Sequence, residues 1–159
     1  MKLEWMGEYR DVIDGLIHYC NIYAAAYKAE KMEYKGVSFS FSQIQVVEYI
    51  LEAEDKKEPM SAIASRLGIS RSNFTKIVNR LISKGLLEKN HLPGNRKNYN
   101  LSVTALGREL YEQYSKKILR WHFSPMFNKL SHIPHEYYSF IHDALYDAMG
   151  GDDCEELNK

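Results

Sequence analysis

The chain has 159 residues, of which 45% are hydrophobic and 26% charged, a composition typical of a globular protein with one ordinary core. Its formal net charge is zero, and no apolar run approaches the roughly 20 residues that span a bilayer. The N-terminus lacks the apolar segment of a secretory signal. Cys20 and Cys154 are the only cysteines and lie far apart, so we expect no disulfide framework and a cytoplasmic protein.

The N-terminal third is predicted to contain two helices. The first runs from about Lys2 to Lys35 and ends at Gly36, because apolar residues recur there at three- and four-residue steps. Its apolar face comprises Tyr9, Val12, Ile13, Leu16, Tyr19, Cys20, Tyr23 and Tyr27. The second helix begins after Ser40, which has the capping-box spacing to Gln43. Its buried stripe is predicted to contain Ile44, Val47 and Leu51.

Two shorter helices joined by a tight turn are predicted next. Pro59 suits the first position of a helix, and Gly68 suits the left-handed residue that ends it. Ser70 then caps a helix that stops at Gly85. The apolar arc of that helix comprises Phe74, Ile77, Val78 and Leu81.

The opposite arc of the same helix is polar and basic and contains no acid. It comprises Ser72, Thr75, Lys76, Asn79, Arg80 and Ser83. Surface helices usually mix charges of both signs, so the absence of acids is informative. From Arg66 to Lys97 the chain holds eight basic residues and one acid, a local charge of +7 in a neutral protein. Such a patch is the electrostatic signature of a polyanion-binding surface.

A two-stranded ribbon is predicted to follow, from Leu86 to Asn90 and from Asn98 to Ser102. The segment Pro93-Gly94-Asn95 between the strands has turn chemistry. Beyond the ribbon, Thr104 is expected to cap a long helix that Pro125 bends or ends.

A last helix is predicted after Pro134, and residues 151–159 form an acidic tail. The apolar side of the last helix comprises Tyr137, Phe140, Ile141, Ala144, Leu145 and Ala148.

Residues 60–110 resemble the MarR family of transcriptional regulators without insertion or deletion. The matching positions are Ile63-Ala64, Leu67-Gly68, Ser70, Thr75-Lys76, Leu81, Gly85-Leu86, Arg96-Lys97, Thr104 and Gly107. Leu92 and Asn95 depart from the pattern, because the family commonly carries there the acids that orient the wing arginine.

The resemblance implies a mainly α fold, a winged helix-turn-helix domain with a two-stranded wing, flanked by N- and C-terminal dimerisation helices. It places the DNA-binding domain at residues 37–107 and the helical dimerisation region at residues 1–36 and 108–150. The implied function is that of a homodimeric DNA-binding regulator, a repressor released from a pseudo-palindromic operator by a small-molecule effector.

The helix after Ser70 is expected to enter the major groove of double-stranded DNA, with the wing tip in the minor groove. The predicted DNA-binding residues are Ser70, Arg71, Ser72, Asn73, Thr75, Lys76, Asn79, Arg80, Asn95, Arg96 and Lys97. The predicted effector pocket, for a small aromatic or anionic molecule, is bordered by His18, Tyr19 and Tyr23. We expect no cofactor, and the six histidines show no metal-ligand spacing.

Two alternatives remain open at this stage. Cys20 lies on the first helix, and one branch of the family senses hydroperoxides with a cysteine there, so a redox-sensing regulator is one alternative. Winged helices also serve as protein-interaction modules, which is the second. The usual hydrolase, nucleotide-binding and metalloprotease motifs are missing from the sequence, which argues against an enzyme.

Overall fold

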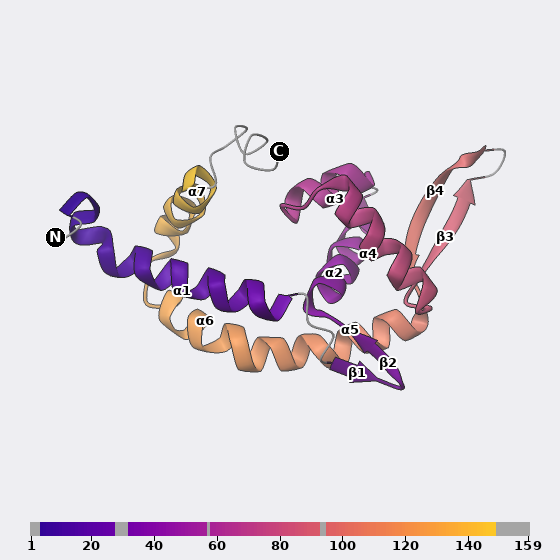
Figure 1. Ribbon diagram of the computed structural model, residues 1–159, viewed down its shortest axis with the longest axis horizontal. Coiled ribbons are helices and arrows are strands. Elements are labelled where there is room, and N and C mark those ends of the chain that lie inside the picture. The colour runs from indigo at the N-terminus through magenta and orange to yellow at the C-terminus, as the bar shows by residue number, and fades with distance from the viewer. Residues whose placement is uncertain (1–3, 28–31, 57, 93–94, 149–159) are drawn as a thin grey trace. The chain divides into compact units, whose positions relative to one another are not determined.

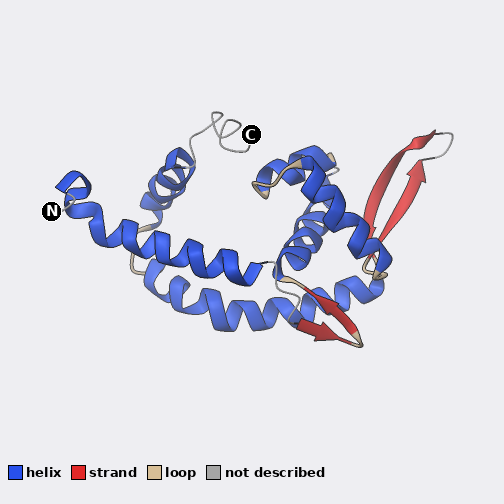
Figure 2. Cartoon of the chain, viewed as in Figure 1, coloured by secondary structure: helices blue, strands red, loops and turns tan. Residues whose placement is uncertain are grey.

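The structure is a computed structural model that describes residues 4–27, 32–56, 58–92 and 95–148 (Figure 1). The chain divides into two units, Met1–Gln113 and Tyr114–Lys159. The described residues are mainly helical, with two separate two-stranded antiparallel sheets (Figure 2). The mainly α fold class with a two-stranded wing is therefore confirmed.

The first unit begins with a short 3-10 helix, Glu4–Tyr9, and the helix α1, Arg10–Tyr27. The expectation that this helix continues to Lys35 is wrong. A small hairpin follows instead, formed by β1, Met32–Tyr34, and β2, Val37–Phe39.

The physical reason for the hairpin lies in its turn. Lys35 and Gly36 both have positive φ, 49° and 77°, as in the two-residue turns whose twist matches that of paired strands. On either side, apolar residues alternate with Glu33 and Ser38, which pair directly across the two strands. This period of two is only three residues long on each strand, so a helical pattern masks it in the sequence.

The helix α2, Phe41–Lys56, is the central element of this unit. Its predicted capping box is confirmed, because Ser40 Oγ accepts from the Gln43 amide and Gln43 Oε1 accepts from the Ser40 amide, each at 3.3 Å. The helix contacts α1, the two helices that follow and the second wing strand. Its buried apolar residues are Ile44, Val46, Val47, Ile50 and Ala53. Ile44 and Val47 are buried as predicted, but the prediction for Leu51 is wrong, because it is only partly buried.

The helix-turn-helix consists of α3, Met60–Arg66, and α4, Arg71–Ser83. Gly68 has φ +62° and ends α3, with the Ile69 amide bonded to the carbonyl of Ala64. Ser70 caps α4 by accepting from the Asn73 amide at 3.2 Å. Both predictions are confirmed, whereas Pro59 is the N-cap of α3 rather than its first helical residue.

The apolar arc of α4 is buried as predicted. Phe74, Ile77, Val78 and Leu81 are all buried, and α4 contacts α2, α3 and the first wing strand. Gly85, with φ +71°, closes α4, and the next two residues, Leu86 and Leu87, are buried.

The wing is formed by β3, Leu87–Leu92, and β4, Asn95–Val103, paired antiparallel with Leu87 opposite Val103. Both strands are longer than predicted, because backbone pairing continues toward the tip beyond the apolar alternation. The register shifts between His91 and Leu92, and residues 93–94 of the predicted turn lie outside the described residues.

The helix α5, Ala105–Ile118, begins where the wing ends. Thr104 caps it as predicted, accepting from the Gly107 amide at 3.1 Å and donating to the Gly85 carbonyl at 2.7 Å. The first turn of α5 therefore lies against the end of α4. Gly107 is buried there, and a Cβ atom at this position would lie 2.3 Å from the Leu86 carbonyl oxygen and 2.8 Å from Val103 Cγ1.

The second unit starts within α5 and continues through a π-helical turn, Leu119–Phe123, into α6, Ser124–Leu130. Pro125 lies in the first turn of α6, where its missing N–H is tolerated. A 3-10 turn, His135–Tyr137, precedes α7, Tyr138–Ala148. Among the described residues, no helix combines the length and apolar character that crossing a membrane requires.

We predict that Gly107→Ala lowers the free energy of unfolding by about 1–3 kcal/mol, because the new methyl group overlaps backbone that cannot easily move. The matched control is Gly15→Ala on α1, where no heavy atom lies within 4 Å of the added Cβ. That variant should gain about 0.5–1 kcal/mol from helix propensity. Urea unfolding of both variants measures the difference, and equal stabilities would contradict the close approach at Gly107.

Candidate nucleic-acid interface

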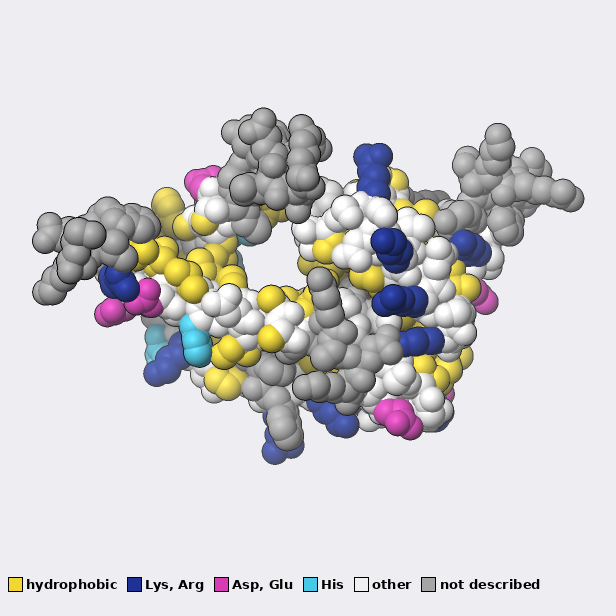
Figure 3. Space-filling model, viewed as in Figure 1, with side chains coloured by type: hydrophobic (Ala, Val, Ile, Leu, Met, Phe, Trp, Pro, Cys, Tyr) yellow, Lys and Arg dark blue, Asp and Glu magenta, His cyan; other side chains and the backbone are white. Residues whose placement is uncertain are grey.

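The outward face of α4 is the candidate interface. Its polar and basic side chains are exposed, and they are Arg71, Ser72, Asn73, Thr75, Lys76, Asn79, Arg80 and Ser83. In Figure 3, Lys and Arg side chains gather over the part of the surface where α4 lies. Because the opposite face of the helix is buried, the packing of the core sets the direction in which these side chains point.

The basic residues of the helix-turn-helix divide into two groups. The side chains of Arg71, Lys76 and Arg80 make no hydrogen bond or ion pair within the described part of the chain, so their charges are available to a ligand. Arg66 and Lys84, which also contribute to the local charge of +7, are bound to other protein groups. The count from the sequence therefore overstates the free positive charge.

Arg66 joins α3 to α2. Its guanidinium forms ion pairs with Glu52 at 2.7 Å and Glu58 at 3.0 Å and lies 4.7 Å from the centre of the Tyr49 ring. These hydrogen bonds raise the pKa of Arg66 further, so it is always charged. The role of Arg66 is structural, because its positive charge is already paired with the carboxylates of Glu52 and Glu58.

Three hydroxyl groups of the α4 segment bond to the local backbone. Ser70 serves as the cap, Thr75 Oγ1 donates to the Arg71 carbonyl at 2.9 Å, and Ser83 Oγ donates to the Arg80 carbonyl at 2.8 Å. The Thr75 hydroxyl has thereby used its proton, but its oxygen can still accept a hydrogen bond, and the side chain is exposed. Such a group accepts from a base amino group or contacts a thymine methyl.

The base of the wing is anchored to α2 through Glu54. One carboxylate oxygen accepts from the Val103 amide at 2.8 Å, and the other pairs with Arg108 on α5. Asn95, Arg96 and Lys97 belong to β4, but their side chains lie outside the described residues, so their contact with DNA stays a prediction.

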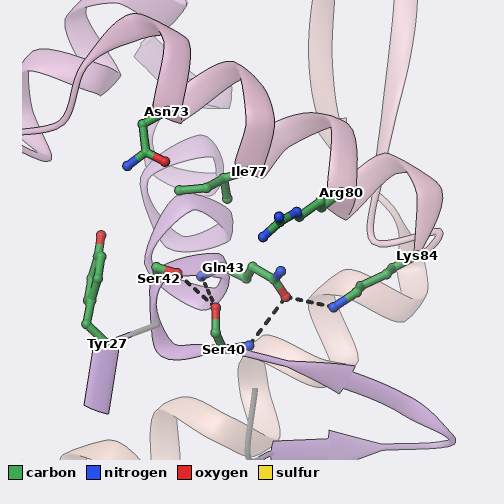
Figure 4. A pocket seen from close by; sticks show the side chains of 8 residues that line it. All are labelled: Tyr27, Ser40, Ser42, Gln43, Asn73, Ile77, Arg80 and Lys84. Atoms are coloured by element: carbon green, nitrogen blue, oxygen red, sulfur yellow. Dashed lines mark hydrogen bonds between the residues drawn. The ribbon is translucent and has the colours of Figure 1, made fainter. Parts of the chain in front are cut away.

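A cavity of about 610 Å³ lies beneath α4 (Figure 4). Its walls come from the end of α1, the start of α2 and the inner edge of α4, and its lining residues are Tyr27, Ser40, Ser42, Gln43, Asn73, Ile77, Arg80 and Lys84. Arg80 and Asn73 are therefore shared between this cavity and the outward face of α4.

The predicted effector residues occupy the neighbouring stretch of α1. His18 and Tyr19 are exposed, whereas Tyr23 is half-buried, stacks with Tyr19, and accepts from Gln45 Nε2 at 2.6 Å. Burial, and after it the neighbouring Tyr27, raises the pKa of Tyr23. None of the three predicted residues is among those lining the cavity, which Tyr27 borders instead, one helical turn beyond Tyr23. An effector site at His18, Tyr19 and Tyr23 stays a prediction.

Cys20, the basis of the redox alternative, is exposed on α1 rather than packed in a core. Among the described residues, no group of three or more His, Cys, Asp and Glu side chains is arranged to hold a metal ion.

The sequence model of the MarR family matches residues 35–98, which run from the hairpin turn to the wing. Over these residues the chain is similar to the MarR family. Members of this family are transcriptional regulators and not enzymes. None of the curated proteins matches the chain.

Solved structures show the same fold over the greater part of the chain. A MarR/EmrR family transcriptional regulator from Acinetobacter sp. ADP1 is 17% identical, with a TM-score of 0.63 over 91% of this chain and 96% of that chain. MepR from S. aureus, solved in complex with DNA, is 16% identical, with a TM-score of 0.60 over 91% of this chain and 97% of that chain. FabT from Streptococcus pneumoniae, also solved with DNA, is 17% identical, with a TM-score of 0.59 over 94% and 99%. The predicted MarR-type winged-helix fold is thereby confirmed.

Sequence reasoning missed three features of this winged-helix domain. The hairpin Met32–Phe39 gave too short a signal, and Tyr27 was assigned only to an apolar face. The internal bonds of Lys84 and Arg66 join residues between 8 and 46 positions apart, so nothing local in the sequence marks them.

We predict opposite phenotypes for two arginines of the helix-turn-helix. Arg66→Met should lower the urea midpoint of unfolding and leave unchanged the slope of log affinity for duplex DNA against log salt. Arg71→Met should leave the midpoint unchanged and reduce that slope by about 0.9 for each phosphate that the variant no longer neutralises. Parallel unfolding and fluorescence-anisotropy titrations measure both quantities, and a reduced slope for Arg66→Met would contradict its structural role.

Proposed function

We propose that this chain is a cytoplasmic, homodimeric transcriptional repressor that binds a pseudo-palindromic DNA operator and is released by a small-molecule effector. The observation that carries the proposal is the outward face of α4, which is exposed, contains no acid, and presents three cations without protein partners in the described chain. Two structures of similar fold, MepR and FabT, were solved in complex with DNA.

In this proposal α4 lies in the major groove. Ser72, Asn73, Thr75, Lys76 and Asn79 reach base edges, because amide, ammonium and hydroxyl groups match the donors and acceptors exposed there. Arg71 and Arg80 bind phosphates and thereby set the register of the helix on the duplex. The wing residues Asn95, Arg96 and Lys97 reach the adjacent minor groove, where narrow A·T-rich segments attract cations.

Dimerisation supplies a second copy of α4, which we call the recognition helix, for the second half-site. Large apolar side chains are exposed on α1 and, separately, on α7, including Val12 at 71% and Phe140 at 68% exposure. Exposed apolar surface of this extent indicates a protein interface. A two-fold dimer requires half-sites about 34 Å apart, one turn of the DNA helix.

The cavity beneath α4 supports the effector part of the proposal. A small anion or aromatic molecule held there would contact Arg80, one of the residues assigned to the DNA backbone. Its binding would compete with DNA, and a few kcal/mol of differential affinity between the bound and free states is enough to switch occupancy.

We predict salt-dependent binding to duplex DNA. If a dimer neutralises roughly 6–10 phosphates, its affinity should fall by about 10³–10⁵ between about 50 and 200 mM salt. Fluorescence anisotropy with a duplex selected from a random pool, and with a scrambled duplex of equal length, measures this dependence. Absence of binding to either duplex at low salt would refute the proposed function and favour a protein-interaction module.

We also predict that Phe140→Asp yields a monomer, because it places a charge within the apolar face of α7 that we propose as part of the dimer interface. Ser139→Asp is the matched control, since it adds the same charge at the adjacent exposed position of α7. Sedimentation velocity distinguishes the two species. A dimeric Phe140→Asp variant would exclude this face of α7 from the interface.

A further inference from the structure

Lys84 occupies the carboxyl end of the recognition helix, immediately after Ser83, and is the C-cap residue of α4. Its side chain points away from the outward face of α4 and toward the start of α2 (Figure 4). Nζ donates to the Ser38 carbonyl oxygen at 2.7 Å and to Gln43 Oε1 at 3.1 Å. At least two of its three ammonium donors are therefore used inside the protein.

Both acceptors, the Ser38 carbonyl oxygen and Gln43 Oε1, belong to segments that other interactions hold in place. Gln43 is 2% exposed, and its carboxamide oxygen also accepts from the Ser40 amide as half of the capping box. Ser38 lies on β2, and the turn of that hairpin is joined to α5 by an ion pair between Lys35 and Glu109. Lys84 thus connects the end of α4 to the hairpin and to the start of α2. The capping box and the Lys35–Glu109 ion pair hold these two segments independently of Lys84.

We propose that Lys84 is a positioning residue for DNA recognition: it orients α4 in the major groove and does not bind phosphate. The inference rests on the proposed function, because it concerns the same helix. It distinguishes Lys84 from Arg80, which precedes it by one helical turn and whose guanidinium has no bonded partner in the described chain.

The physical reason is the difference between apolar and directional contacts. The four buried apolar side chains of α4 hold the helix against the core, but burial of apolar surface is non-directional. Small rotations or translations along the helix axis change it little. Hydrogen bonds from a charged donor are short and directional, so a pair of them at one end selects one orientation of the helix. Base readout depends on that orientation, whereas attraction to phosphates depends on it much less.

The test compares Lys84→Met with Arg80→Met, two changes that each remove one cation from α4 and keep an unbranched side chain. Each full-length protein is titrated with a selected duplex and a scrambled duplex over a range of salt concentrations. Lys84→Met should lower affinity for the selected duplex about tenfold, with the scrambled duplex and the salt slope unchanged. Arg80→Met should weaken binding to both duplexes and reduce the slope by about 0.9 for each phosphate that is no longer neutralised.

Lys84→Arg supplies the rescue variant, because a guanidinium can donate to the same two oxygens, and it should retain most of the preference for the selected duplex. Circular dichroism verifies that each variant is folded. If Lys84→Met does not fold, Lys84→Gln takes its place with the same expected direction, because its side chain is one bond shorter and carries no charge.

A reduced salt slope for the Lys84 variant would show that Lys84 binds phosphate, and an unchanged preference for the selected duplex would show that it does not position α4. Either result overturns the inference. Failure of the wild-type protein to bind either duplex is a different outcome, since it refutes the proposed function itself.

Discussion

The burial of one face of α4 against α2 is the constraint on which the rest of the interface depends. Phe74, Ile77, Val78 and Leu81 are buried in the core, so the polar and basic side chains of α4 are left exposed. Because no acid lies on the outward face, all of its charged side chains are cations. The same packing places Asn73 and Arg80 at the rim of a cavity whose other walls come from α1 and α2. One set of apolar contacts thus determines both where a nucleic acid would lie and where a small molecule could compete with it.

The basic residues of the helix-turn-helix fall into two groups, those with unpaired side chains and those bonded to other parts of the protein, and their charge alone does not tell the groups apart. Arg71, Lys76 and Arg80 have no partners in the described chain, whereas Arg66 fastens α3 to α2 and Lys84 fastens α4 to the hairpin and the start of α2. A surface that binds a polyanion by counterion release needs mobile, unpaired cations. A helix that reads base edges needs a fixed orientation as well. The division between free and bound cations meets both requirements within one small domain.

Much of the local structure was predictable from the sequence. The capping box at Ser40, the cap at Ser70, the left-handed Gly68 and the cap at Thr104 are confirmed, as is the buried arc of α4. The extension of the first helix to Lys35 was wrong, because a two-residue turn and strands of three residues carry too few positions for a period of two to stand out. The outward residues of α4 are exposed as the proposed interface requires, and their contacts with DNA stay predictions.

What the sequence determined by itself is the part of the structure that depends on neighbours a few positions away. Helix caps, turn glycines and the spacing of apolar residues act within one or two turns of chain, so their physical effect is visible in the order of residues. Only the tertiary structure decided which cations are free, which tyrosine borders the cavity, and why Gly107 admits no side chain. Lys84 and Gln43 are 41 positions apart, and Lys35 and Glu109 are 74 apart. Such partners come into contact only after the core has brought distant segments together, so no local sequence pattern marks them.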